Sequence, residues 1–125
     1  MKILFVSSEM APFCKTGGLA DVAGSLPKAI KSMGHDIRAI IPKYKMVDDG
    51  NYKLKVVFED IQVKVGDETQ YATLYETKIP GTDVIVYLIG NENYFGRDGL
   101  YQENGRDFAD NARRFIFFCK AVLAA

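Results

Sequence analysis

Two short apolar runs, separated by a loop and an amphipathic segment, open the chain and constrain its fold most. Residues 3–6 are continuously apolar, which is typical of a strand buried in a parallel sheet. A second apolar run, which includes Arg38, covers residues 37–41 and ends at Pro42. A strand, a helix and a strand within about 40 residues match the size of a right-handed βαβ unit. The sequence therefore predicts an α/β fold whose ligand crevice lies at the carboxyl ends of the strands.

The segment between these runs is predicted to be a helix. Its apolar residues recur every three or four positions, as on one helical face, and Gly34 supplies a C-terminal stop signal. We expect Pro27 to kink or break the helix, because proline cannot donate a hydrogen bond to the preceding turn. The residues of the apolar face are Leu19, Val22, Ala23, Leu26, Ile30 and Met33.

The middle of the chain has an alternating pattern instead. Apolar and polar residues alternate over residues 54–58, 61–65 and 71–75, which indicates half-exposed antiparallel strands. Turn dipeptides at residues 66–67 and 80–81 predict hairpin connections. Residues 84–89 are again continuously apolar, and we expect them to rejoin the central sheet.

A long polar loop, residues 90–106, precedes the last helix. Loops beyond roughly 12–15 residues are usually functional or disordered, and the aromatic residues here argue against disorder. Asp107 is the expected N-cap of a helix that runs to Ala125 without a stop signal. We therefore expect residues 1–125 to be the leading part of a longer domain. The apolar face assigned to this helix comprises Phe108, Ala112, Phe115, Ile116, Cys119, Val122 and Leu123, and we expect Cys119 to lie in the core.

Composition and charge exclude several classes of protein. Hydrophobic residues make up 48% and charged residues 26% of the chain, as in an ordinary globular domain. With 16 basic and 16 acidic residues the net charge is zero, which disfavours a general nucleic-acid binder. No apolar run approaches the roughly 20 residues of a membrane span. The two cysteines lie far apart and form no metal-ligand pattern, so we expect a cytoplasmic protein without a metal site.

The segment that joins the first strand to the first helix carries residues suited to binding phosphate. Glycine lets a backbone approach a ligand closely, and Gly17 and Gly18 precede the helix. The first turn of a helix presents unpaired N–H groups and a positive dipole end, and Lys15 adds a mobile cation. Alternatively, the glycines only let the chain turn and Lys15 is a solvated surface charge. The spacing matches neither the dinucleotide fingerprint nor the P-loop pattern.

Several motifs occur in order along nearly the whole chain. The most specific is the string Lys15-Thr16-Gly17-Gly18-Leu19-Ala20-Asp21-Val22, which follows Ser8-Glu9-Met10 and precedes Gly24-x-Leu26-Pro27. The later motifs are Gly34-His35, Pro42-x-Tyr44, Val86-Tyr87-Leu88, Tyr94-Phe95-x-Arg97-x-Gly99-x-Tyr101 and Asp110-Asn111-x-x-Arg114-Phe115. In these motifs the chain resembles the N-terminus of bacterial glycogen synthases and plant starch synthases.

The resemblance implies a GT-B glycosyltransferase, in which two Rossmann-like domains face a cleft. Residues 1–125 would form the N-terminal part of the acceptor-side domain, a three-layer αβα unit with an antiparallel β-hairpin insertion. The rest of that domain and the C-terminal domain would be missing. The implied reaction transfers glucose from ADP-glucose to the non-reducing end of an α-1,4-glucan with retention, and needs no cofactor. The main catalytic residues would lie beyond residue 125, so we expect the fragment alone to be inactive.

The resemblance also assigns residues to the ADP-glucose site. Lys15 would contact the phosphates, the N–H of Gly18 would approach the distal phosphate, and Gly17 would allow the turn. Asp21 would belong to the same site, although a carboxylate in the first turn of a helix also favours the helix dipole.

Two further residues are assigned to the acceptor side. Glu9, after the first strand, would face the glucan or glucose, or would cap the loop. Tyr101 would stack on an acceptor sugar, or would pack within its loop. His35 is expected at the surface or at the helix end, not in catalysis. Cys14 adjoins Lys15, which would lower its pKa, but we expect a plain loop cysteine.

Two interpretations from other classes of protein stay open. One is a stand-alone phosphate- or nucleotide-sugar-binding module, which would bind a nucleotide sugar with this chain alone. The other is a flavodoxin-like interaction domain without a small ligand, for which Lys15→Ala would leave every binding assay unchanged.

Overall fold

A five-stranded mixed sheet forms the middle layer of the fold in the computed structural model, which describes residues 1–125. Its strands are β1 (Lys2–Val6), β2 (Asp36–Pro42), β3 (Lys55–Val65), β4 (Glu68–Lys78) and β5 (Ile85–Gly90), in the order β1-β2-β5-β4-β3. The first three strands in that order are parallel, and β5, β4 and β3 are antiparallel. The predicted α/β class, the βαβ unit and the return of β5 to the central sheet are confirmed.

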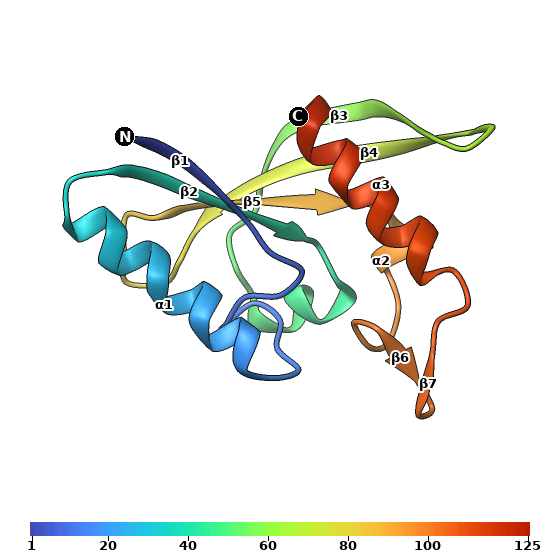
Figure 1. Ribbon diagram of the computed structural model, residues 1–125, viewed down its shortest axis with the longest axis horizontal. Coiled ribbons are helices and arrows are strands. Elements are labelled where there is room, and N and C mark those ends of the chain that lie inside the picture. The colour runs from blue at the N-terminus through green and yellow to red at the C-terminus, as the bar shows by residue number, and fades with distance from the viewer.

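Two long helices complete the three layers (Figure 1). Helix α1 (Gly18–Ser32) packs against β2, and α3 (Asn111–Ala124) packs against β3 and β5. The other elements are short: the 3₁₀ helix η1 (Lys45–Gly50), α2 (Glu92–Phe95), and the paired strands β6 (Gln102–Glu103) and β7 (Arg106–Asp107). No helix in the structure is both long and apolar enough to cross a membrane.

Helix α1 follows its sequence signals closely. It ends at Ser32, and the following Gly34 has a φ of +94°, which favours glycine. The expected break at Pro27 does not occur, because the helix continues across this residue. Proline removes only one hydrogen bond of the helical ladder, and the buried ring of Pro27 is held by packing.

Strand β3 replaces the two separate strands expected at residues 54–58 and 61–65. Its pairing with β4 shifts register between Val56 and Phe58 and again between Phe58 and Ile61. Asp60, within this irregular stretch, has a φ of +57°. The alternation changes phase at such a bulge, and this is why the sequence pattern looked like two elements.

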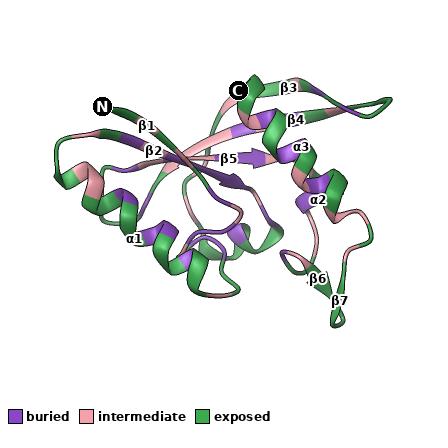
Figure 2. Ribbon diagram, viewed as in Figure 1, coloured by how far each residue is buried: buried purple, intermediate pink, exposed green.

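Helix α3 differs from its prediction at its start and in its orientation. Its N-cap is Asp110, whereas Asp107 belongs to β7. The buried residues of α3 are Arg114, Phe117, Phe118 and Ala121, while four of the seven residues of the expected core face are exposed and three are half-buried (Figure 2). Cys119 is exposed, so its predicted core position is wrong. The exposed face includes Ile116 at 48% and Leu123 at 88% exposure. Both sides of this helix are apolar, so periodicity alone could not select the buried one.

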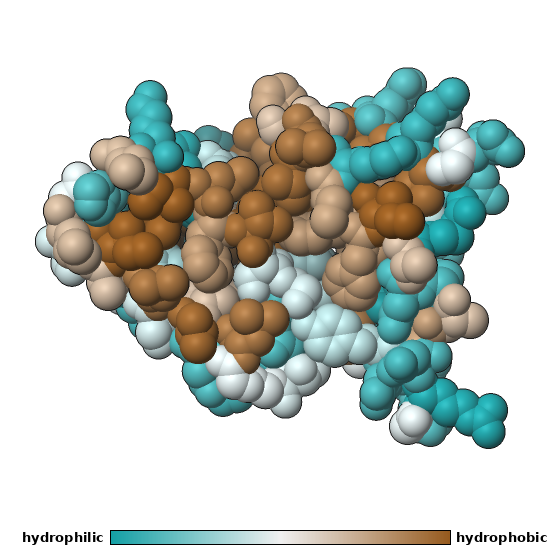
Figure 3. All heavy atoms as spheres, in the orientation of Figure 1, coloured by the Kyte–Doolittle hydropathy of each residue, from teal (hydrophilic) through white to brown (hydrophobic).

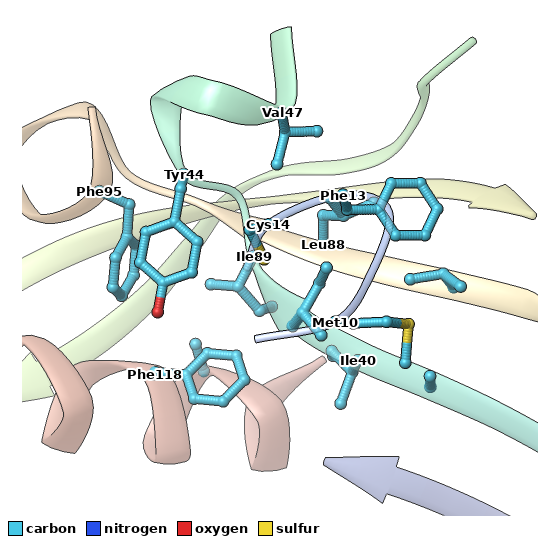
Figure 4. Close-up of a cluster of buried hydrophobic side chains, with 14 of the residues drawn as sticks. Met10, Phe13, Cys14, Ile40, Tyr44, Val47, Leu88, Ile89, Phe95 and Phe118 are labelled. Carbon is cyan, nitrogen blue, oxygen red and sulfur yellow. The ribbon is translucent and has the colours of Figure 1, made fainter. Parts of the chain in front are cut away.

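The hydrophobic core extends into the loop after β1 (Figure 4). Met10, Phe13 and Cys14 of this loop are at most 1% exposed. Met10 and Cys14 also exchange backbone hydrogen bonds of 3.0 and 2.9 Å. The loop between β1 and α1 is therefore anchored in the core, and this fixes the position of the residues that follow it.

Candidate functional site

Glu9 lies at the carboxyl end of β1 and is only 2% exposed. Its Oε2 atom accepts hydrogen bonds from the Thr16 amide at 3.2 Å, the Thr16 hydroxyl at 2.6 Å and the Tyr101 hydroxyl at 3.1 Å. Its Oε1 atom has no partner within the chain and is not among the fully buried unpaired atoms, so it keeps contact with solvent. Glu9 therefore caps the loop, as one of the two sequence-based alternatives predicted, and still presents one free oxygen.

Tyr101 connects the long loop after β5 to the loop after β1. Its hydroxyl donates its only proton to Glu9, so the Ser8 hydroxyl, 2.8 Å away, donates to Tyr101. Burial raises the pKa of the Tyr101 phenol further above physiological pH, where a phenol is already a neutral donor. Its ring packs against Phe115 with a centroid distance of 5.8 Å. The structure thus brings Tyr101 to Glu9, which is 92 residues earlier in the sequence.

Lys15 and Asp21 form an ion pair on the surface of the same loop and helix. The ammonium donates to both carboxylate oxygens, at 2.7 and 2.8 Å. Both side chains are more than half exposed, so the pair stabilises the fold by less than about 1 kcal/mol. Such a weak internal contact leaves Lys15 free to exchange Asp21 for a stronger anion.

Gly17 and Gly18 stand at the start of α1, where the surrounding space is open. No heavy atom would lie within 4 Å of a Cβ added at either residue. Gly17 is the N-cap, and no side chain caps the first N–H groups of the helix. Its φ of −164° is extended backbone that any residue adopts, so the bend at Gly17 does not require glycine for backbone conformation. Open space, not backbone strain, is what the two glycines provide.

Two shallow cavities flank this loop. One of about 300 Å³ is lined by Thr16, Tyr101 and their neighbours at residues 99–102. The other, of about 280 Å³, lies between the loop and α1 and includes Asp21 and Lys28 in its lining. No group of three or more His, Cys, Asp or Glu side chains is placed to hold a metal ion. His35 lies at the far end of α1, 3.3 Å from the N-terminal amine, as its surface prediction implied.

The structure adds residues that the sequence did not assign to the site. Ser8 and Tyr44 support Tyr101 and the loop: the Tyr44 hydroxyl donates to the Ser8 carbonyl at 2.7 Å. Thr16 holds Glu9, and Arg114 holds the loop that carries Tyr101. All four of these residues lie within the sequence motifs on which the family resemblance rests. The one local signal for Arg114 was its position directly before the apolar stretch from Phe115 to Phe118.

Comparison with known proteins identifies the family. Residues 2–125 match the family described as the starch synthase catalytic domain. Glycogen synthase 1 of Geobacter metallireducens is 48% identical over 98% of this chain, and the glycogen synthase of Moorella thermoacetica is 46% identical over 99%. The chain spans about a quarter of the length of these relatives, 25% and 24%.

A solved structure gives the same result for the fold. The catalytic domain of starch synthase IV from Arabidopsis thaliana, bound to ADP and acarbose, superimposes with a TM-score of 0.78. It is 26% identical, and the match covers 98% of this chain and 24% of that one. The fold is therefore that of a part of a GT-B catalytic domain, and the chain belongs to the starch synthase catalytic domain family.

Proposed function

We propose that residues 1–125 form the N-terminal part of the acceptor-side domain of a glucosyltransferase. The complete enzyme would transfer glucose from ADP-glucose to the non-reducing end of an α-1,4-glucan with retention. Membership in the family supports this proposal, as do the relatives named glycogen synthase and the neighbour bound to ADP and acarbose. A C-terminal domain of the same protein would complete the site, and the fragment alone would be inactive. A cytoplasmic location belongs to the same proposal.

The loop Lys15–Gly18 carries the proposal, because it combines a cation, a helix N-terminus and open space. The Lys15 ammonium is held only by the exposed Asp21 carboxylate. The uncapped start of α1 and the empty surroundings of Gly18 let an anion approach the backbone. These groups suit the diphosphate of ADP-glucose, whose leaving ADP gains negative charge in the transition state. Lys15 would exchange Asp21 for the diphosphate, with Asp21 beside the site.

Glu9 and Tyr101 are proposed to serve the acceptor side. The free Oε1 atom of Glu9 is available to accept a hydrogen bond from a sugar hydroxyl. Tyr101 is one of the residues that line the cavity of about 300 Å³ next to Thr16. Aromatic faces suit the apolar face of a pyranose ring. Both residues therefore combine a structural contact with a surface that a glucan can reach.

The test is glucosyl transfer by the full-length enzyme that carries this chain. Lys15→Ala is expected to lower kcat/KM for ADP-glucose by about 10²-fold or more, as when one preorganised charge-stabilising donor is removed. Lys31→Ala is the matched control, because Lys31 is a lysine in the last turn of α1, at the opposite end of the helix from the Lys15–Gly18 loop. Transfer by Lys15→Ala at the wild-type rate would remove Lys15 from the phosphate site. Absence of transfer by the wild-type enzyme would refute the proposed reaction itself.

A further inference from the structure

Arg114 of α3 is a fully buried cation without an acidic partner. The residue is 0% exposed, and none of the seven ion pairs includes it. Asp110, at the start of the same helix, is already bound by Arg97 through two contacts of 2.7 Å. Burying an uncompensated charge is costly, so the contacts that surround this guanidinium indicate what the residue does.

Two hydrogen bonds of Arg114 hold the backbone of the long loop, and a third holds the side chain of Asn111 at the start of α3. Its Nε atom donates to the Tyr94 carbonyl at 2.6 Å, and Nη1 donates to the Leu100 carbonyl at 2.8 Å. Nη1 also donates to the Asn111 side-chain oxygen at 2.9 Å, while the Asn111 amide donates to the Tyr101 carbonyl at 3.0 Å. The rigid fork of one guanidinium therefore fixes both ends of segment 94–100 and the backbone of Tyr101.

Aromatic rings replace the missing carboxylate around this guanidinium. Its Cζ atom lies 5.3 Å from the ring centroid of Phe95, 4.7 Å from that of Phe108 and 5.4 Å from that of Phe115. Nη2, the one fully buried side-chain polar atom without a hydrogen bond, belongs to the same group. Ring quadrupoles attract a desolvated cation without taking up its donors. The donors of Arg114 thus remain available for the loop carbonyls.

A continuous set of contacts leads from Arg114 to the phosphate-binding loop. Arg114 binds Leu100, the residue before Tyr101, and Asn111, which donates to the Tyr101 carbonyl. The Tyr101 hydroxyl in turn donates to Glu9. Glu9 accepts hydrogen bonds from the amide and the hydroxyl of Thr16. Thr16 lies between Lys15 and Gly17 in the sequence. We infer that Arg114 is a positioning residue for the Lys15–Gly18 loop and acts through Tyr101 and Glu9. The kinetic part of this inference rests on the proposed function; the structural part does not.

The test is a double-mutant cycle in the full-length enzyme. Arg114→Met and Tyr101→Phe are made singly and together. If Arg114 acts through Tyr101, the kcat/KM of the double variant should be no lower than that of Arg114→Met alone. Arg114→Met is expected to raise KM for ADP-glucose and to lower kcat/KM by about tenfold to 10²-fold, the scale of a displacement of about 1 Å at a reacting centre. Hydrogen exchange of the amides of residues 15–18 should become faster in the same variants.

Arg113→Met is the matched control, because Arg113 is the preceding residue on α3 but is bound to Glu68 and the Val65 carbonyl of the β3–β4 hairpin. It should leave loop exchange and KM unchanged. Arg114→Lys keeps the charge but cannot span both carbonyls, so it takes the place of Arg114→Met if that variant does not fold. Additive effects, or a loss of folded enzyme at unchanged KM and loop exchange, would overturn the inference. If the wild type transfers no glucose, the hydrogen-exchange rates of residues 15–18 in the same variants still decide the role of Arg114.

Discussion

At the scale of single residues, the chain places its surface charges in weak pairs and its buried charges in specific sites. Lys15 and Asp21 are exposed and paired, so their contact adds little stability and is easily exchanged. Glu9 and Arg114 are buried without ion partners, and each makes hydrogen bonds to loop segments instead. Removing either buried charge therefore disturbs a loop, whereas removing a surface charge alters only what the surface can bind.

Cys14 is predicted to be chemically inert in the folded chain. Burial raises the pKa of its thiol to about 12, against the lowering that a neighbouring lysine would cause. At pH 8 the thiolate is then about one part in 10⁴. A thiol reagent should modify the exposed Cys119 quickly and Cys14 only in denaturant, as peptide mapping by mass spectrometry would measure. Equal labelling of both cysteines in the native chain would contradict the buried position.

The same thiol makes stability depend on pH in one direction. The pKa of Cys14 is about 12 in the folded chain and near the ordinary value of 9.0 in the unfolded chain. Above about pH 9 the unfolded chain releases a proton that the folded chain retains, so this residue lowers the free energy of unfolding as pH rises further. Cys14→Ala should reduce the loss of stability above pH 9 in denaturant titrations, whereas Cys119→Ala should not.

At the scale of elements, local signals predicted what local interactions decide. The start of α1, its stop at Gly34 and the strand character of residues 84–89 depend on a few adjacent residues, and they were predicted correctly. The buried side of α3 depends on what packs against it, and its sequence is apolar on both sides. Likewise, the Asp110 carboxylate is occupied by Arg97, a contact across 13 residues that no capping pattern reveals.

The two glycines of α1 are predicted to have different reasons for being glycine. A Cβ added to Gly24 would lie 2.5 Å from the Ala11 carbonyl oxygen, whereas a Cβ on Gly18 would meet nothing within 4 Å. Gly24→Ala should therefore push α1 away from the loop and lower the free energy of unfolding by about 1–3 kcal/mol. Gly18→Ala should leave stability unchanged or raise it by up to about 1 kcal/mol, because alanine favours a helix.

For ligand binding, unlike for stability, a substitution at Gly18 is expected to be harmful. If the Gly18 amide approaches a phosphate, an added methyl group obstructs the ligand while the fold stays intact. Denaturant unfolding and ADP-glucose affinity, measured on the same full-length variants, separate the two effects. A destabilised Gly18→Ala variant, or a fully stable Gly24→Ala variant, would contradict the close contact of α1 with Ala11 and the open space at Gly18.

At the scale of the whole molecule, the site joins residues that no local pattern connects. Glu9 and Tyr101 are 92 residues apart and meet because the carboxyl ends of β1 and β5 lie on the same edge of the sheet. The resemblance in the sequence assigned both to one side of a cleft but did not show that they touch. Their contact depends on the conformation of the long loop, which Arg114 holds from the far side.

A large apolar surface remains uncovered over β1 and α3 (Figure 3). Leu4 and Val6 of β1 are 49% and 47% exposed, and Leu123 of α3 is 88% exposed. A cavity of about 310 Å³ on this side has an entirely hydrophobic lining: Leu4, Ile40, Val57, Phe58, Leu74, Tyr87, Val122 and Ala125. Contiguous exposed apolar patches promote association in water. The 125-residue chain by itself is therefore expected to self-associate as its concentration rises.

Light scattering coupled to size-exclusion chromatography measures this association. Leu4→Glu and Leu123→Glu should shift the 125-residue chain toward the monomer, because each introduces a charge that must be desolvated for two apolar surfaces to meet. Leu26→Glu is the control, since Leu26 is also exposed, at 42%, but belongs to α1 and not to the surface over β1 and α3. A wild-type chain that stays monomeric at high concentration, or equal effects of all three substitutions, would contradict association through this surface.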